Sequence, residues 1–487
     1  MNLFILIFLK FIIIFGFSNK IIASCRINVA VQSIMPTKDP LKAVSWWEKR
    51  EATLQFDTLL RFNESGEVEP WLARKWQFSK DLKKLTIDLR PGVKFTDGSE
   101  IDSNDVIKSL KRFIGPESID HGRLSYIKKI TYINKQRLEI NLSHPFIPLL
   151  YYLATPRSGI VKVLRKTEII GSGPWIFFKS DTNNSKKVQL WKANENYFNG
   201  APLCKELGLI EIPTNELADS FRSNFIDLIE YYPTSKLVQK DFKQVFGSNS
   251  EIQNFPSYDV TALFFSEKTK SPIEKSSRRE LYQIIAEEFN TQDLSFGYSK
   301  VCSILPYGMS LNRSEPCISK KSKNLIINPK TFTIHTQNDE RWQILKKIAE
   351  IAKKQSFILN FKFSTLAEMY AKHGKGDINI HIETLTMQIP EAYGVLSMFE
   401  SSSGENFSKY SNFSFDNLLN KAKSEKDFAK RKEYYLRAED ILLKDAIVIP
   451  LVHQSRVSIF SKKISGYNSN SIGPFYASYD KILKKEE

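Results

Sequence analysis

The histidines are the side chains of this sequence best suited to bind a transition metal, and their spacing argues against a metal site. None belongs to an HExxH motif, and no cysteine pair has the spacing of zinc ligands. His373 and His381 are close in sequence, but Gly374 and Gly376 interrupt any helix between them. The sequence therefore predicts no metal site. The histidines are His121, His144, His335, His373, His381 and His453.

The segment Gly171-Ser172-Gly173 has the composition of a nucleophile turn or of a phosphate-binding loop. Pro174 follows it and lacks the backbone N–H that a phosphate cradle uses. The sequence contains no GxSxG elbow, no P-loop and no GxGxxG loop. We therefore interpret these glycines as a turn before a strand, and we expect no catalytic residue, no cofactor and no enzyme activity.

Residues 1–24 are almost entirely apolar, with Lys10 and Lys20 as their charged residues. Their length and position predict a signal peptide, with a membrane anchor as the alternative. Their small-residue end favours cleavage, but with Cys25 it also forms the lipobox Ile-Ala-Ser-Cys, which predicts lipid attachment. We favour the soluble form, because Arg26 alone separates Cys25 from the first expected strand and leaves no tether.

Four cysteines in an exported chain favour disulfide bonds. Cys302 and Cys317 flank the turn-rich segment 305–308, so we predict that they are bridged. Such a short closed loop is worth about 3 kcal/mol in the chain-entropy model. Cys25 and Cys204 remain. They can form a second bridge if Cys25 survives cleavage with a free thiol, whereas lipid attachment to Cys25 would leave Cys204 single.

The composition is that of a folded soluble protein, with 42% hydrophobic and 25% charged residues and a formal net charge of +16. After export roughly 460 residues remain, enough for two or three lobes. The lysines are dispersed, as in Lys346-Lys347 and Lys353-Lys354, which favours a solvated basic surface. No basic motif with interleaved aromatic residues suggests a nucleic-acid partner.

The chain's regular patterns predict alternating strands and helices. Leu85, Ile87 and Leu89 alternate with polar residues, as in a strand with one buried face. Turn dipeptides follow, and Ser103 is placed to cap a helix whose first turn contains Asp105. Other expected elements are strands at 27–31, 137–142 and 207–212 and helices at 50–60, 339–354 and, with a break, 415–445.

The sequence of residues 71–113 resembles the signature of the family 5 extracytoplasmic solute-binding proteins, which are the dipeptide and oligopeptide receptors of ABC importers. In that family a tryptophan-rich segment and a strand precede an RxGVKFxDG-like turn and a helix that starts at a DV pair. The matching residues are Arg90, Gly92, Val93, Lys94, Phe95, Asp97, Gly98, Asp105 and Val106.

Further segments resemble the family in the same order along nearly the whole mature chain. Asn224 and Phe225 stand where the family usually has a Gly-Glu pair, which is a minor departure. The matching segments are 171–177 (GSGPWIF), 190–200 (LWKANENYFNG), 225–228 (FIDL), 410–416 (YSNFSFD) and 438–451 (AEDILLKDAIVIPL).

The resemblance implies an α/β fold of the periplasmic-binding-protein type (cluster C), with two lobes, a hinge and an extra inserted domain. It implies hinge crossings near Thr261–Ser266 and Lys463–Tyr467, and closure of the lobes around a solute. The implied divisions are a signal peptide (1–24), a discontinuous domain I (25–49, 159–262 and 466–487), domain II (50–158) and domain III (263–465), the second ligand-binding lobe.

The resemblance also implies a function. The chain is expected to be a periplasmic, monomeric receptor for a peptide or peptide-like solute, with an inner-membrane ABC permease and its ATPase as partners. A sensor or chaperone of the same fold without a transporter, and a receptor for a non-peptide solute, are the alternatives.

Peptide-binding members hold the ligand's free amino group with an aspartate in a DP-like loop. Here Ile389 precedes Pro390 where that aspartate is expected, and the family's tryptophan is missing as well. Either Glu383 or Glu391 supplies the charge from a shifted position, or the ligand lacks a free amine. The expected ligand-binding residues are Met35, Trp47, Glu383, Thr384, Thr386 and Glu391.

Overall fold

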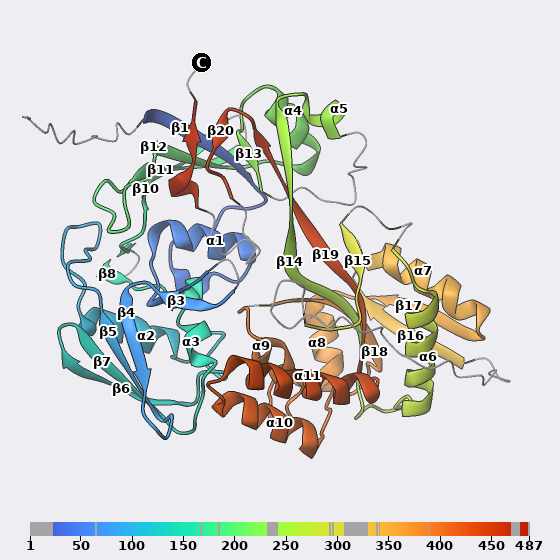
Figure 1. The fold of residues 1–487 in the computed structure, drawn as a ribbon. Helices are drawn as coiled ribbons and strands as arrows, with labels where there is room; N and C mark the ends of the chain where they lie inside the picture. The colour runs from blue at the N-terminus through green and yellow to red at the C-terminus, as the bar shows by residue number, and fades with distance from the viewer. Residues whose placement is uncertain are drawn as a thin grey trace, which may run out of the picture.

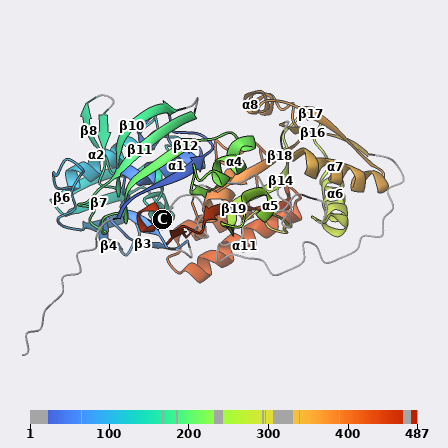
Figure 2. The ribbon, with the colours of Figure 1, turned by 90° about the horizontal axis from the view of Figure 1, so that it is seen from above.

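The computed structural model of the chain shows a mixed α/β structure in two lobes (Figure 1; Figure 2 shows them from above). We name the lobe at the left and top of Figure 1 the first lobe, and the lobe at the right and bottom the second lobe. None of the helices among the described residues has the length and apolar character that crossing a bilayer requires. The described residues are 23–63, 66–165, 168–183, 186–230, 242–291, 294, 297–305, 330–337, 339, 341–387, 389–468 and 478–485.

One large sheet runs through both lobes. Its strands pair in the order β10-β11-β12-β1-β13-β19-β14-β18-β16-β17, and β15 also pairs with β19. β1 is parallel to β12 and β13, and β16 is parallel to β17 and β18, which confirms the predicted α/β class. The strands are β1 (Ala23–Val31), β10 (Trp175–Asn183), β11 (Lys186–Ala193), β12 (Cys204–Glu211), β13 (Leu228–Ile229), β14 (Ser250–Phe265), β15 (Tyr298–Lys300), β16 (Lys330–Thr336), β17 (Phe357–Phe363), β18 (Ile380–Thr386) and β19 (Val448–Ser461).

The long antiparallel strands β14 and β19 pass from one lobe to the other (Figure 1). Their pairing shifts in register after Pro256 and again after Thr261, and such irregularities bend and twist a strand pair. Within this irregular segment Arg456 of β19 and Asp259 of β14 form a buried ion pair, with Nη2 2.5 Å from Oδ2. The two strands are therefore held together by charge as well as by backbone hydrogen bonds at the crossing between the lobes.

The expected crossing points differ from those observed. Thr261–Ser266 contains the carboxyl end of β14, which already belongs to the second lobe. Lys463–Tyr467 follows β19, after that strand has returned to the first lobe. The sequence patterns mark where these strands end, whereas the crossing lies inside them.

A smaller sheet completes the first lobe, with the strand order β4-β5-β7-β6 and α2 packed beside it. β5 and β7 confirm the predicted strands, and Leu85, Ile87 and Leu89 are buried on one face as expected. The helix predicted after them is also present. The bounds are β4 (Ala73–Phe78), β5 (Lys84–Leu89), β6 (Ile127–Asn134), β7 (Arg137–Leu142) and α2 (Ser103–Phe113).

Two predicted helix starts were wrong. The residue that caps α2 is Asp102, because its carboxylate accepts from two backbone N–H groups while Asp105 bonds back to the Asp102 N–H; Ser103 is the first helical residue. Helix α1 spans Trp46–Gln55 instead of 50–60. A capping box at Ser45 starts it early, and the chain after Gln55 is extended.

Helices cover the strands of the second lobe. In α7 Leu345, Ile348 and Ile351 are buried along the predicted apolar stripe, and α10 and α11 confirm the predicted helix, break and helix. The remaining bounds used below are β2 (Leu60–Phe62), α3 (Leu149–Tyr152), α6 (Lys275–Glu288), α7 (Arg341–Lys354), α8 (Leu366–Gly374), α9 (Tyr393–Leu396), the 3-10 helix η6 (Ser397–Phe399), α10 (Phe413–Ser424) and α11 (Phe428–Lys444).

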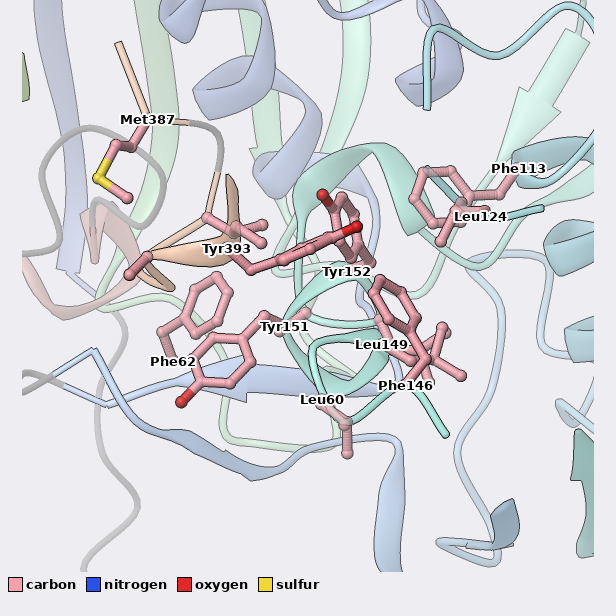
Figure 3. Packing of buried hydrophobic residues seen from close by; sticks show 14 of the residues in the cluster. Leu60, Phe62, Phe113, Leu124, Phe146, Leu149, Tyr151, Tyr152, Met387 and Tyr393 are labelled. Atoms are coloured by element: carbon pink, nitrogen blue, oxygen red, sulfur yellow. The ribbon is translucent and has the colours of Figure 1, made fainter. Parts of the chain in front are cut away.

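The two lobes touch through buried apolar side chains. Figure 3 shows Tyr393 and Met387 of the second lobe among aromatic and aliphatic residues of the first. The ring of Phe146 lies 5.4 Å from the ring of Tyr393, edge to face. The Ile147 N–H donates to the carbonyl oxygen of Lys423 on α10, at 2.8 Å. We call this surface the lobe contact.

A disulfide bond joins Cys25 on β1 to Cys204 on β12, with Cα atoms 4.9 Å apart. The sequence left two alternatives open, a bridge between these cysteines or a lipid on Cys25 with Cys204 single. The structure contains the bridge. Cys302 is also disulfide-bonded, and its predicted partner Cys317 lies outside the described residues.

Loss of the Cys25–Cys204 bridge should destabilise the protein. Because the two cysteines are 179 positions apart, their link strongly restricts the unfolded chain, and removing it should cost about 2–4 kcal/mol in urea unfolding. The variants Cys25→Ser, Cys204→Ser and the double variant should lose equal amounts, since each removes the same bond. Recovery of Cys25 as a free or lipid-modified thiol in peptide maps of native protein would contradict the assignment.

A second buried interaction holds the first lobe together. Arg50 of α1 forms an ion pair with Glu230, just after β13, and both side chains are almost wholly buried. The ring of Tyr479, near the carboxyl end, lies 5.2 Å from the Arg50 guanidinium. Burial raises the pKa of Glu230 to about 7, although Arg50 opposes this shift.

The Glu230 side chain should make stability depend on pH. Its folded pKa lies above the ordinary value of 4.5, so the folded state binds the proton more tightly than the unfolded state. The free energy of unfolding of the wild type, relative to that of Glu230→Gln, should therefore decrease by roughly 3 kcal/mol as pH rises from about 4.5 to about 7. Above that pH the difference should stay constant. Urea unfolding at pH 5 to 8 measures it. A difference in the free energy of unfolding that does not change with pH would contradict this assignment. The variant Glu433→Gln, at an exposed position, provides the control.

Candidate functional site

A cavity of about 70 Å³ lies in the second lobe beside β18. Successive side chains of a strand point to opposite faces, so His381, Glu383 and Leu385 line the cavity while Ile380 and Ile382 enter the apolar core. The other lining residues are Phe264 of β14, Met369 and His373 of α8, Met398 and Phe399 of η6, and Glu405, Phe407 and Ser408 of the following loop.

Two histidines meet at this cavity. The rings of His373 and His381 are 4.5 Å apart and nearly perpendicular. Among the described residues, His373 Nε2 and His381 Nδ1 are buried and have no hydrogen-bond partner. Burial lowers the pKa of His373 to about 4 and that of His381 well below its usual value, so both imidazoles are neutral at pH 7.

Aromatic rings form one wall of the cavity. Phe264 stacks on His381 with ring centroids 5.1 Å apart, and on Phe399 at 6.2 Å. These rings and the two methionines make most of the wall apolar. The wall therefore suits an apolar group, and the imidazoles provide its polar atoms.

Glu383 is the predicted ligand residue that lines the cavity. Its Oε1 accepts from Arg341 Nη1 at 3.0 Å, and its side chain is 28% exposed. Burial raises the pKa of this carboxyl, although Arg341 opposes the shift. Glu383 is thus a partly exposed carboxylate that already has one cationic partner.

Glu405 connects the cavity to the first lobe. Its carboxylate forms an ion pair with Arg123, which lies 282 residues earlier in the chain. Arg123 Nη1 lies 3.6 Å from the buried Asp120, whose other carboxylate oxygen lies 2.7 Å from Arg157. A residue of the cavity therefore takes part in the charge network that joins the lobes.

The other two predicted residues on β18 do not line this cavity. Thr384 points to the opposite face, where its hydroxyl lies 2.9 Å from that of Thr261 on β14. Thr386 is exposed at the carboxyl end of β18. Their role in ligand binding remains a prediction.

Glu391 is buried and engaged elsewhere. It is 1% exposed, and its Oε1 accepts from Tyr435 at 2.5 Å and from Arg431 at 3.2 Å. Arg431 also donates to the Tyr151 hydroxyl of the first lobe, so this pair belongs to the lobe contact. The contacts of Glu391 indicate a structural role, because a buried pair that loses one partner leaves a costly isolated charge.

Met35 and Trp47 lie in the first lobe, away from the cavity. Met35 is buried beside α1, and its N–H donates to Glu51 at 2.8 Å. Trp47 is also buried, and its ring N–H donates to Gln32 at 2.8 Å. Neither residue lines the cavity that contains Glu383.

Sequence reasoning missed the two histidines of the cavity. Gly374 and Gly376 do separate them, as expected, but the strand that follows returns His381 beside His373 on α8. The alternation of His381, Glu383 and Leu385 along β18 was the available signal. Within the described part of the chain, no three His, Cys, Asp or Glu residues are grouped so as to hold a metal ion.

Comparison with known proteins finds similarity to one family. Residues 67–281 match the family described as bacterial extracellular solute-binding proteins, family 5 Middle. The probable D,D-dipeptide-binding periplasmic protein DdpA of Escherichia coli (strain K12) is 24% identical over 441 residues, which cover 83% of each chain.

Solved structures share the fold. HbpA2 from Haemophilus parasuis has a TM-score of 0.80 at 17% identity, covering 95% of this chain and 100% of that one. The ABC transporter-associated periplasmic binding protein DppA from Helicobacter pylori, in complex with the peptide STSA, has a TM-score of 0.76 at 19% identity, covering 95% and 98%. The fold is thus that of the periplasmic binding proteins, and residues 67–281 are similar to the middle part of the family 5 extracellular solute-binding proteins.

The Arg123–Glu405 pair should favour the closed arrangement of the lobes. Glu405→Gln removes one charge, and because the Glu405 side chain is 40% exposed the loss should be about 1 kcal/mol or less. We expect a larger mean radius of gyration in solution scattering without solute. Glu433→Gln, which changes an exposed pair within α11, is the matched control. Equal radii for wild type and Glu405→Gln would contradict the assignment.

Proposed function

We propose that this chain is an exported receptor that captures a small solute between its lobes and delivers it to an ABC importer. The observation that carries the proposal is the position of the cavity: Glu405 lines it and also pairs with Arg123 of the opposite lobe. Occupation of the cavity can therefore influence lobe closure directly. The match of residues 67–281 to the family of extracellular solute-binding proteins supports the same role.

Closure would work by a shift of population. A solute that contacts both lobes stabilises the closed arrangement by its extra affinity for that arrangement, and by no more. β14 and β19 supply the hinge, since they pass between the lobes. The partners would be an inner-membrane permease and its ATPase, which recognise the closed, loaded monomer.

We infer a periplasmic location. The Cys25–Cys204 disulfide supports an oxidising compartment, and it uses the thiol that lipid attachment would need. We therefore infer a soluble form, released by cleavage before Cys25.

A binding role without catalysis fits the cavity. Ser408, a hydroxyl residue of the lining, donates to Asn406 at 2.6 Å instead of to a histidine. Its hydroxyl therefore does not have the contact with a general base that would activate a nucleophile.

The solute class follows from the two glutamates. Arg431 and Tyr435 already engage Glu391, which is fully buried. Glu383 is partly exposed and therefore remains the residue that could accept a ligand ammonium group. One relative named above is a probable D,D-dipeptide-binding protein and one solved structure is a complex with the peptide STSA, so we propose a peptide or peptide-like solute.

A ligand screen tests this proposal. Mature protein should gain thermal stability with a di- or tripeptide from a panel that includes D,D-dipeptides and N-acetylated forms; a concentration of 100 Kd adds about 2.7 kcal/mol. The radius of gyration should decrease with the same ligand, because the bound form is closed. An unchanged radius at saturation would contradict hinge closure. Peptide uptake by cells that lack this chain would contradict the transport role and leave a sensor or chaperone.

A further inference from the structure

The cavity beside β18 leaves two buried polar atoms without partners. Both histidines line it, and among the described residues neither His373 Nε2 nor His381 Nδ1 has a hydrogen bond. His373 is 6% exposed. Both atoms are buried, and a turn of either ring would bring its unpaired nitrogen to the cavity. Leaving such an atom unpaired costs free energy, so an occupant that bonds to the turned ring gains more than one that only fills the space.

Charges near the cavity are already balanced. Arg341 pairs with Glu383, and Arg123 pairs with Glu405. The imidazoles are neutral at pH 7 because burial opposes their protonation. A charged group placed against the two imidazoles would therefore lose its hydration without gaining a counter-ion, so an uncharged group is favoured there, whereas the solute's ammonium group would lie at the exposed side of Glu383.

The size of the cavity restricts the occupant further. Its volume of about 70 Å³ is roughly half of the 150 Å³ of an engineered cavity that binds benzene. An aromatic ring is therefore too large unless the walls move. A group of about three heavy atoms fits, with its carbon atoms against Phe264 and Phe399.

The type of polar atom follows from the imidazoles. A neutral imidazole nitrogen donates in one tautomer and accepts in the other. A hydroxyl group both donates and accepts, so it can satisfy either nitrogen, whereas an N–H or a carbonyl can satisfy one tautomer alone. A short aliphatic group with one hydroxyl therefore matches the cavity in size, polarity and hydrogen bonding.

We propose that this cavity is a specificity pocket for a small hydroxyalkyl group of the solute, such as a threonine side chain, whose hydroxyl bonds to His373 or His381. The inference rests on the proposed function as a receptor for peptide-like solutes. Valine is the matched competitor, because it has the same shape but no hydroxyl and would leave the imidazoles unpaired. A site built to bond a hydroxyl rejects such an analogue far better than an apolar pocket separates two alkyl groups.

Calorimetry with matched tripeptides tests the pocket. Thr-Ala-Ala, Ala-Thr-Ala and Ala-Ala-Thr are compared with their valine counterparts on the mature protein. At one position the threonine peptide should bind about ten- to a hundredfold more tightly. Equal affinities at every position would overturn the proposal while leaving peptide binding itself intact.

Variants separate hydrogen bonding from packing. His373→Phe removes the ring nitrogens and should abolish the preference for threonine, whereas His373→Gln retains a polar nitrogen and should restore part of it. His121→Phe, at an exposed position in the first lobe, should preserve the full preference. A preference that survives both His373→Phe and His381→Phe would overturn the proposal.

A small probe decides the outcome if no tripeptide binds, which would count against a peptide receptor. Propan-2-ol is titrated into protein labelled with 15N-histidine, and the ring nitrogens of His373 and His381 are followed by NMR. Saturable shifts that are absent in His373→Phe would support the pocket independently of peptides. Ring signals that do not change would overturn the pocket as well.

Discussion

The pairing of β14 with β19 is the constraint on which the arrangement of the two lobes depends. The strands carry the sheet from one lobe to the other, and Arg456 and Asp259 are buried together where their register is irregular. Separating Arg456 from Asp259 inside the protein, where water cannot reach them, would leave two isolated charges and cost free energy. Sliding one strand along the other would also break the ladder. The lobes can therefore move by bending and twisting this strand pair, which its irregular register already favours.

The cavity lies one strand away from this hinge. β18 pairs directly with β14, so that Glu383 is opposite Ala262 and Leu385 is opposite Val260. A change in the twist of β14 must therefore reach the residues that line the cavity. The carboxyl group of Glu405 adds a second connection, since it joins the same cavity to the first lobe. If the cavity binds the solute as proposed, ligand recognition and lobe movement would share these residues, and no long-range pathway would be needed to couple them.

Local patterns in the sequence were sufficient to predict most helices and strands, but not to predict which residues meet at the candidate site. The strand Arg137–Leu142 has the predicted bounds, because alternation and turn residues act over a few neighbours. The start of α1 was missed because Ser45 and Glu48 form a capping box outside the apolar stretch. Family resemblance predicted the fold class, and the large mixed sheet and the similar solved structures confirm that fold class.

Contacts between distant residues could not be derived in this way. Arg123 and Glu405 are 282 positions apart, and nothing in either neighbourhood indicates the other. Glu391 was expected among the ligand-binding residues, and nothing near it in the sequence indicated that Arg431 and Tyr435 of α11 bond to its buried carboxylate. For the same reason His373 and His381 looked unrelated, although the turn after α8 and the strand β18 place their rings side by side.

The apolar lobe contact has a thermodynamic consequence for the empty protein. Phe146 and Tyr393 contact each other directly across the lobe contact, so bringing the lobes together removes hydrocarbon from water by itself. That gain lowers the free energy of the closed arrangement before any solute arrives. The solute then needs to supply less of the closing energy, and its apparent affinity is reduced less by the open population. The same contact makes the closed population of empty molecules more like that of loaded molecules. A transporter that recognised closure alone would therefore also bind receptors that carry no solute.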